Sequence, residues 1–322
     1  MPDQPLPDQP AKLELRVKAM AWEADGVLSV TLAAPGGGEL PPWTPGAHID
    51  ADFAPGLSRQ YSLCGDPADR RHWRIAVLRE PAGRGGSEFV HTRLRPGDTV
   101  AANGPRNRFA LETAGEYLFI AGGIGITPLL PMLAAASAAG AAWRLLYGGR
   151  QRESMAFLDV IAAYRGQAEI LPQDESGLLP VEEAVAATGP GAVVYCCGPA
   201  PLLAAAEESC ARYRRALHLE RFTAKPSGSR DTADGAFEVV CKRSGITVPV
   251  SAGQSVLSAL EDAGLPVSSS CQEGICGTCE TAVLDGDIDH RDSVLSDDER
   301  AAGDTMFICV SRSRSPRLVL DL

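Results

Sequence analysis

Four of the nine cysteines are spaced for metal chemistry. The pattern C-x4-C-x2-C, followed by a distant fourth cysteine, is formed by Cys271, Cys276, Cys279 and Cys309. Three thiolates on one tight loop, closed by a fourth from a separate segment, have the ligand spacing of a [2Fe–2S] cluster. Gly274 and Gly277 suit a loop whose backbone approaches the sulfides and whose amides donate to sulfur. A zinc site or buried free thiols are the alternatives, but zinc favours paired C-x2-C spacings.

A second group of residues suits a flavin. In Arg59-Gln60-Tyr61-Ser62, the arginine can neutralise a phosphate, the tyrosine can pack against a ring, and the serine can hydrogen-bond a ring nitrogen. The run Gly83-Arg84-Gly85-Gly86-Ser87 leads into a predicted helix and is typical of a phosphate-binding turn, although an ordinary turn can have the same composition. The predicted flavin contacts are Arg59, Tyr61, Ser62, Val77, Arg84, Gly85, Gly86 and Ser87.

A third group follows an apolar strand predicted at 116–121. Its sequence, Gly122-Gly123-Ile124-Gly125-Ile126-Thr127-Pro128, is not the G-x-G-x-x-G fingerprint, but the same physics applies. Glycines let a pyrophosphate approach the backbone, and the N-terminus of the next helix faces it. After the second predicted strand, Arg150 and Arg152 can hold a 2′-phosphate, line the pyrophosphate or face solvent. The predicted nucleotide contacts here are Gly122, Gly123, Gly125, Thr127, Pro128 and Arg150.

These motifs need scaffolds of different kinds. Residues 11–113 read as short strands between Pro/Gly turns, which favours a barrel. Beyond residue 115, apolar strands alternate with helices, which predicts a parallel sheet covered on both faces. The expected parallel strands are 116–123, 143–149, 168–173 and 192–199, and the expected helices are 128–140, 155–166 and 202–216.

A small β-rich domain is predicted to hold the four spaced cysteines. Residues 225–235 are rich in Pro, Gly, Ser and Asp and are the expected linker to it. A hairpin at 237–250, a helix at 254–265 and a terminal strand at 317–322 are expected to form this domain. The predicted division is therefore 1–110, with a flexible lead at 1–11, then 111–228 and 229–322.

Charge and composition limit the classes of function. The net charge is −11, and residues 231–322 alone carry 16 acidic and 7 basic side chains. An acidic chain is a poor partner for nucleic acid or an anionic membrane surface. No apolar run is long enough to span a membrane, and no secretory signal opens the sequence. With an odd number of cysteines and no export signal, a reduced, cytoplasmic setting is expected.

The cysteine-bearing stretch, from about Phe237 to Leu322, resembles a plant-type ferredoxin, and it matches C-x-x-G-x-C-G-x-C at every position from 271 to 279. The flavin and nucleotide motifs, in this order, resemble the ferredoxin reductase superfamily. Together they resemble the phthalate dioxygenase reductase and vanillate demethylase reductase group over residues 12–322. The resemblance implies an antiparallel flavin-binding β-barrel, an NAD-binding α/β domain with a parallel sheet, and a β-grasp-like ferredoxin domain.

The resemblance also implies cofactors and residue roles. It implies FMN, and the monophosphate-sized group formed by Arg84 and Ser87 agrees with this. Cys197-Gly198-Pro199 matches the nicotinamide-side motif, and Glu220-Arg221-Phe222 matches the segment that brings an aromatic residue to the flavin. The implied nicotinamide contacts are Cys197, Gly198 and Pro199. The implied catalytic positions are Ser62, Thr127, Cys197 and Phe222.

The implied function is transfer of electrons from NADH through FMN and the cluster, singly, to a terminal oxygenase of Rieske type. NADPH stays possible because of the arginines after the second parallel strand. Alternatives are another acceptor, such as a cytochrome P450 or an amine-demethylating mono-oxygenase, and a redox-sensing module. The oligomeric state is left open, and a monomer is compatible with the sequence.

Two further sets of residues have weaker interpretations. The acidic residues between the third and fourth cysteines are expected to be either a solvated face or a steering surface for a basic partner. The scattered histidines are expected to be structural or exposed; they are His48, His72, His91, His218 and His290.

Overall fold

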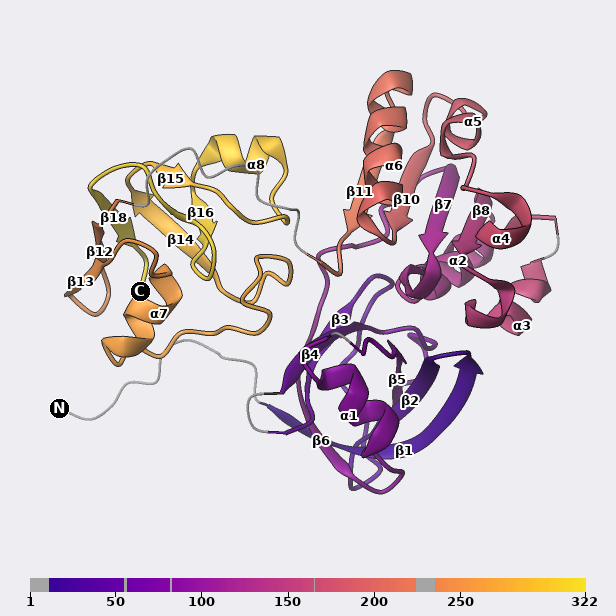
Figure 1. The fold of residues 1–322 in the computed structure, drawn as a ribbon, viewed down its shortest axis with the longest axis horizontal. Coiled ribbons are helices and arrows are strands. Elements are labelled where there is room, and N and C mark those ends of the chain that lie inside the picture. The colour runs from indigo at the N-terminus through magenta and orange to yellow at the C-terminus, as the bar shows by residue number, and fades with distance from the viewer. Residues whose placement is uncertain (1–11, 55–56, 82, 165, 224–234) are drawn as a thin grey trace. The chain divides into compact units, whose positions relative to one another are not determined.

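The chain forms two compact units, one ending at Arg221 and the other beginning at Phe222. The computed structural model describes residues 12–54, 57–81, 83–164, 166–223 and 235–322 (Figure 1). The predicted lead at 1–11, and residues 225–234 of the predicted linker, lie outside this part. None of the helices in the described ranges is both long and apolar enough to cross a lipid bilayer.

The first unit begins with an antiparallel sheet in the strand order β4-β3-β6-β1-β2-β5 (Figure 1). The two edge strands approach each other and close the sheet, since the Cys64 amide, just after β4, donates to the Arg74 carbonyl on β5 at 2.8 Å. The inward side chains form one apolar core, including Leu32, Ile49 and Trp73. The sheet and its helix confirm the predicted barrel. Their elements are β1 (Leu13–Ala24), β2 (Val27–Ala33), β3 (His48–Asp52), β4 (Ser58–Ser62), β5 (His72–Leu78), α1 (Gly86–Thr92) and β6 (Thr99–Arg106).

A parallel sheet in the order β11-β10-β7-β8-β9 follows in the same unit. Side chains alternate between two cores: Phe119 and Tyr195 face the side of α2, whereas Leu118 and Val194 face α5 and α6. This alternation explains why the strands read as continuous apolar runs and confirms helices on both faces. The strands are β7 (Glu116–Gly122), β8 (Ala142–Gly149), β9 (Ala168–Pro172), β10 (Val193–Cys197) and β11 (Ala216–Glu220).

Two details of this sheet differ from the sequence-based expectation. Strand β11 was not expected: the run to residue 216 was assigned to a helix, but helix α6 ends at Tyr213 and Arg214 takes a left-handed conformation with φ 53°. The helix expected at 155–166 is shorter and is divided into α3 and η3; it starts only at Leu158, because Phe157 takes a left-handed conformation with φ 64°. The helices are η1 (Gly123–Ile126), α2 (Leu129–Ala138), η2 (Arg152–Ser154), α3 (Leu158–Ile161), η3 (Ala162–Tyr164), α4 (Gln173–Ser176), α5 (Val181–Ala186) and α6 (Ala200–Tyr213).

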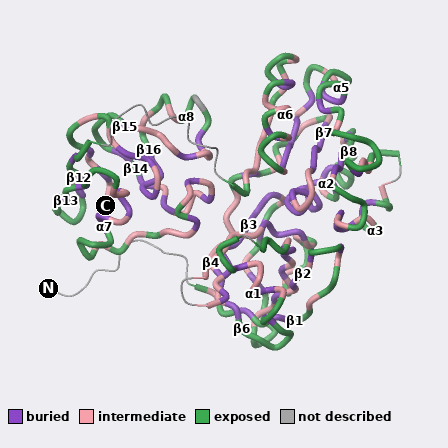
Figure 2. Tube along the Cα trace, viewed as in Figure 1, coloured by how far each residue is buried: buried purple, intermediate pink, exposed green. Residues whose placement is uncertain are grey.

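The second unit is a mixed sheet in the order β13-β12-β18-β14-β16, with β12 and β18 parallel. Its core, drawn purple in Figure 2, includes Val239, Leu260, Phe307 and Leu318. The predicted hairpin, helix and terminal strand are all present. The elements are β12 (Phe237–Cys241), β13 (Ile246–Val250), α7 (Val256–Asp262), β14 (Glu280–Asp285), β15 (Ile288–Asp289), α8 (Asp297–Ala302), β16 (Thr305–Phe307), β17 (Arg312–Ser313) and β18 (Arg317–Leu320).

Candidate redox site

The barrel and the parallel sheet meet at a serine, a cysteine and a glutamate. Ser62, the last residue of β4, donates its hydroxyl to Glu220 Oε2 at 3.0 Å. The Cys197 thiol, at the end of β10, is 3.9 Å from the same oxygen. Cys197 and Glu220 are partners in the parallel register of β10 and β11, so the strand ends bring both side chains to this point. Two predicted catalytic residues, Ser62 and Cys197, therefore both contact the carboxylate of Glu220.

Glu220 was not among the predicted site residues. Burial raises the pKa of its carboxyl to about 7, and the hydrogen bonds from Ser62 and Cys197 only partly offset that rise. Burial also raises the pKa of Cys197, so this residue is a neutral thiol at neutral pH. The signal for Glu220 was present in the sequence, because the alternating stretch Ala216–Leu219 ends at this acid and could have been read as a strand.

The two predicted nucleotide motifs touch each other backbone to backbone. A Cβ placed on Gly125 would lie 2.2 Å from the Cys197 carbonyl oxygen, and one on Gly122 would lie 2.6 Å from Pro199 Cδ. Gly198 also lies close, because a Cβ placed on it would lie 3.0 Å from the Gly122 backbone. These loops leave β7 and β10, which neighbour each other at the point where strand order reverses in the sheet, the usual ligand crevice of such folds.

The remaining nucleotide residues take varied places. Thr127 is 3% exposed, and its hydroxyl donates to the Ile124 carbonyl at 3.0 Å, which closes the glycine-rich turn. Gly123 has φ 54°, and Pro128 precedes helix α2. Arg150 is exposed after β8, and its carbonyl accepts from the Asp174 amide. Glycines for backbone approach, followed by a ten-residue helix, fit a pyrophosphate.

The predicted flavin phosphate residues come together on one side of the barrel. Arg59 donates to the Ser58 carbonyl at 2.6 Å and to the Arg84 carbonyl at 2.5 Å. A Cβ on Gly86 would lie 2.5 Å from Arg59 Cγ, so the turn packs on the arginine stem only because this residue is glycine. Gly85 has φ 83° and precedes α1. Two arginines from distant segments on one small-residue turn fit a terminal monophosphate such as that of FMN.

Other predicted flavin residues have structural contacts. Tyr61 packs edge-on against Phe53 with ring centroids 5.9 Å apart. The Ser87 hydroxyl accepts from the Glu80 amide at 3.0 Å. Val77 lies in the barrel core and its carbonyl contacts His91 Nε2, which are the contacts of a packing residue. Phe222 is 39% exposed and begins the second unit, so its predicted approach to the flavin stays a prediction.

All four predicted cluster ligands are buried and close together in the second unit. Contact with Cys271, and burial, raise the pKa of the Cys276 thiol, and Cys309 lies within hydrogen-bonding reach of Cys271 and Cys279. Backbone amides point at the sulfurs: Glu273 donates to Cys271 Sγ at 3.3 Å and Thr278 to Cys276 Sγ at 3.4 Å. Four converging thiols with amide donors fit an anionic [2Fe–2S] cluster.

Fold and site together define a flavin- and nucleotide-binding reductase joined to a [2Fe–2S] ferredoxin domain. A family model described as "2Fe-2S iron-sulfur cluster binding domain" matches residues 239–314. The solved structure of phthalate dioxygenase reductase, described as a modular structure for electron transfer from pyridine nucleotides to [2Fe-2S], is similar, with a TM-score of 0.71 and 36% identity over 97% of this chain and 98% of that one.

The names of curated relatives also point to oxygenase systems. "Phenoxybenzoate dioxygenase subunit beta" of Ectopseudomonas oleovorans is 47% identical over 97% of this chain and 98% of its own length. "Vanillate O-demethylase oxidoreductase" of a Pseudomonas species is 40% identical over 96% of this chain and 100% of its own. The chain therefore belongs to the phthalate dioxygenase reductase and vanillate O-demethylase reductase family. This confirms the predicted class, an NADH-dependent reductase component of an oxygenase with FMN and a [2Fe–2S] cluster.

A self-sufficient cytochrome P450 monooxygenase of type IV is also similar. Its structure matches with a TM-score of 0.90 and 43% identity, and covers 100% of this chain. This chain corresponds to only 43% of that protein.

Proposed function

We propose that this chain delivers electrons to a separate Rieske-type terminal oxygenase, and that the Ser62–Glu220–Cys197 group is where hydride enters. The observation that carries the proposal is the convergence of these residues at one carboxylate oxygen, at the junction of the barrel and the nucleotide-binding sheet. Relatives named as subunits of a dioxygenase and an O-demethylase support an oxygenase partner. The proposed parts remain residues 1–110, 111–228 and 229–322, in a cytoplasmic protein.

The flavin, when bound, converts a two-electron hydride into single electrons that a [2Fe–2S] cluster can accept. The chain's own residues position the reactants. Arg59 and Arg84 hold the flavin phosphate, the Gly122–Gly125 turn admits the nucleotide pyrophosphate, and Gly198 keeps the two nucleotide loops in contact. Ser62 presents a hydroxyl whose proton is shared with Glu220. Neutral Cys197 covers the other side of this carboxylate without adding charge.

The linear route is tested with Cys276→Ser. This change removes one cluster ligand, so reduction of cytochrome c by NADH is expected to disappear while reduction of a two-electron dye continues. Cys241→Ser is the matched control, because Cys241 is a buried cysteine of the same unit, on β12. Its replacement should leave both activities unchanged. Loss of both activities in Cys276→Ser, with FMN still bound, would show that the route is not linear. The cofactor extracted from the unaltered protein should be FMN, and stoichiometric FAD would contradict the flavin assignment.

A cytochrome P450 is the second candidate acceptor, favoured by the similarity to the self-sufficient P450 protein. The two are separated by supplying the reduced chain with either a purified Rieske oxygenase or a purified P450. If NADH oxidation is linked to turnover of the Rieske oxygenase and not of the P450, the first proposal is supported. If it is linked to turnover of the P450 and not of the Rieske oxygenase, the P450 is the acceptor and the first proposal is wrong.

A further inference from the structure

Strand β11 carries Glu220 at the edge of the parallel sheet. It stands at the end of the order β11-β10-β7-β8-β9, so among the described residues it pairs with β10 alone. Its five residues, Ala216–Glu220, include no fully buried one. Short edge strands of this kind open locally more readily than central strands. The last residue of β11 therefore needs a further contact if its side chain is to keep one position.

Side chains alternate across the end of this strand. Glu220 points to Ser62 on β4, whereas Leu219 packs in the core beside α6. Arg221, the next residue, points to the α6 side again, and its Nη2 donates to Glu207 Oε1 at 2.7 Å. Helix α6 lies against β10 and β11 (Figure 1). Arg221 thus fastens the end of β11 to a helix that the strand's own hydrogen bonds do not reach.

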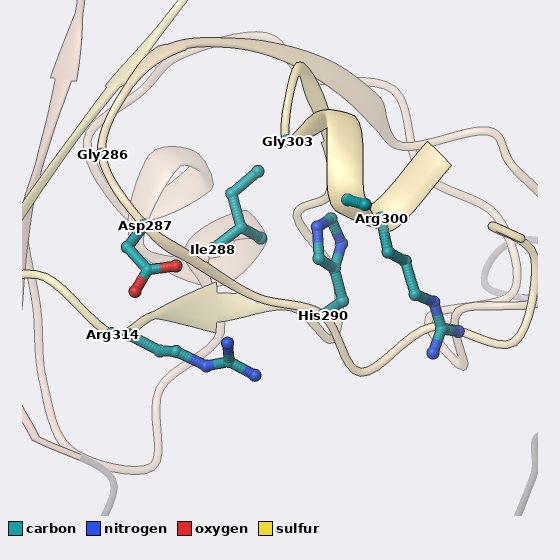
Figure 3. A pocket seen from close by; sticks show the side chains of 8 residues that line it. Gly286, Asp287, Ile288, His290, Arg300, Gly303 and Arg314 are labelled. Atoms are coloured by element: carbon teal, nitrogen blue, oxygen red, sulfur yellow. The ribbon is translucent and has the colours of Figure 1, made fainter. Parts of the chain in front are cut away.

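The ion pair between Arg221 and Glu207 differs from a surface pair. The Arg221 side chain is 8% exposed and that of Glu207 is 39% exposed. By contrast, Arg314, which lines the cavity at His290 shown in Figure 3, is 62% exposed and lies 3.9 Å from Asp289. Exposed pairs contribute little, whereas a buried guanidinium is costly without an acceptor. The backbone at Arg221 is therefore held where this side chain can reach α6.

Helix α6 is itself tied to the nucleotide loops. It begins at Ala200, directly after Cys197-Gly198-Pro199, and the Leu202 amide donates to the Pro199 carbonyl at 2.9 Å. A Cβ placed on Gly122 would lie 2.8 Å from Leu202 Cδ2, so the first turn of α6 touches the glycine-rich turn. An anchor on α6 therefore fixes Glu220 relative to the helix that supports both nucleotide motifs.

We propose that Arg221 is a positioning residue for the hydride-entry site: by binding Glu207, it holds the end of β11 so that the Glu220 carboxyl stays beside Ser62 and Cys197. This inference rests on the proposed function, in which hydride enters at that carboxyl. Arg221 and Glu220 are neighbours in the chain whose side chains leave it on opposite sides. Arg221 therefore acts through the backbone, not by contact with the reactants.

A positional role and a role of charge predict opposite pH effects. Burial raises the pKa of Glu220 to about 7, and hydrogen bonds from Ser62 and Cys197 partly offset that rise; the Arg221 guanidinium is not among the groups that shift it. A carboxyl that is no longer held in place becomes more hydrated, so its pKa falls. Loss of a nearby positive charge would instead raise the pKa of Glu220.

Arg221→Met tests the inference in the intact holoprotein. NADH oxidation with a two-electron dye is measured as a function of pH, and amide hydrogen exchange of residues 216–220 is followed by mass spectrometry. We expect kcat to fall about tenfold, since a positioned acid–base group is partly lost, while the KM for NADH changes by less than about twofold. The midpoint of the pH profile should move down by about one pH unit, and exchange should be about tenfold faster.

Three further variants complete the test. Glu207→Gln removes the acceptor and should cause the same changes to a smaller extent. Arg221→Lys keeps the ion pair and should restore most of the rate and the pH midpoint. Glu208→Gln is the matched control, because Glu208 is the next residue on α6, is 74% exposed and pairs with Arg212 at 3.1 Å. The visible absorption of flavin and cluster checks that each variant is intact, and Glu207→Gln decides the question if Arg221→Met loses its cofactors.

Three results overturn the inference, and they differ in what else they affect. If Glu220→Gln is impaired but Arg221→Met keeps the rate, pH midpoint and exchange of the unaltered protein, Arg221 does not position Glu220 and the proposed function stands. If the pH midpoint of Arg221→Met moves up, Arg221 acts by its charge. If Glu220→Gln is itself normal in rate and pH profile, the proposed hydride-entry site is wrong, and the inference fails with it.

Discussion

At the scale of single residues, the proposed hydride-entry site contains a buried carboxyl group, that of Glu220, whose pKa lies near neutral pH. Burial raises the pKa of Glu220 to about 7, so the group is protonated below that pH and ionised above it. When protonated, Glu220 can supply a proton, by way of the Ser62 hydroxyl, to the group that accepts hydride. When ionised, it places a negative charge at the position where we propose that hydride enters.

We therefore expect NADH oxidation, measured with a two-electron dye, to slow as pH rises through about 7. Glu220→Gln should abolish this pH dependence and lower the rate by about 10²-fold, within the range for loss of a positioned acid–base group. Glu112→Gln is the control, because its side chain is 63% exposed. An unchanged pH profile in Glu220→Gln would show that another group titrates.

A second residue-scale prediction concerns the choice of nucleotide. Arg152, considered above as a 2′-phosphate contact, is held by Glu175 through two hydrogen bonds of 3.1 and 3.0 Å. Glu175→Gln should release Arg152 and lower the KM for NADPH by about fivefold, while the KM for NADH changes little. The double change Glu175→Gln with Arg152→Gln should remove the gain. Steady-state kinetics with both nucleotides measures this, and equal shifts for both would contradict it.

At the scale of elements, the site depends on how closely two strand-end loops approach. The local pattern predicted the glycine-rich turn, and the family resemblance implied the roles of Thr127 and Cys197. The turn and Thr127 follow β7, and Cys197 is the last residue of β10, two strands that the apolar patterns located. Their contact was not predictable, because it follows from the neighbouring positions of β7 and β10 in the sheet. Strand β11 is not predicted because it has only five residues, is only partly buried, and follows directly on a segment whose composition favours a helix up to residue 216.

Gly125→Ala tests the close approach. Its Cβ would lie 2.2 Å from the Cys197 carbonyl, so η1 must move away from β10. We expect a loss of about 2 kcal/mol, seen as a fall in Tm of several degrees, with a higher KM for NADH. Gly115→Ala is the control, since nothing lies within 4 Å of its Cβ position. If the two variants unfold at the same temperature, the loops have more room than the structure shows.

At the scale of the whole molecule, charge is divided unequally. Residues 1–230 carry 25 acidic and 23 basic side chains, whereas residues 231–322 carry 16 and 7. The cluster-bearing unit therefore has the field that attracts a basic electron acceptor.

This division predicts how salt affects electron transfer. Reduction of cytochrome c, a cationic acceptor, should slow by about tenfold or more between 20 mM and 300 mM NaCl, because screening removes long-range attraction. Reduction of an uncharged small acceptor at the flavin should change much less. Stopped-flow rates at several salt concentrations measure both. A parallel decline of the two rates would place the salt effect before the cluster.

The sequence alone located the four spaced cysteines and the glycine-rich turns that are predicted to hold the cofactors, because local spacing and residues such as Gly86 and Gly125 define them. It also determined the barrel and the parallel sheet, because burial on one or both faces imposes its own periodicity. Only the tertiary structure showed which side chains become neighbours as a result of the order of the strands. Glu220 meets Ser62 across 158 positions of sequence, and His290 meets Arg314 and Arg300 around one cavity. These contacts depend on which strands and loops become neighbours, and the local sequence pattern does not contain that information.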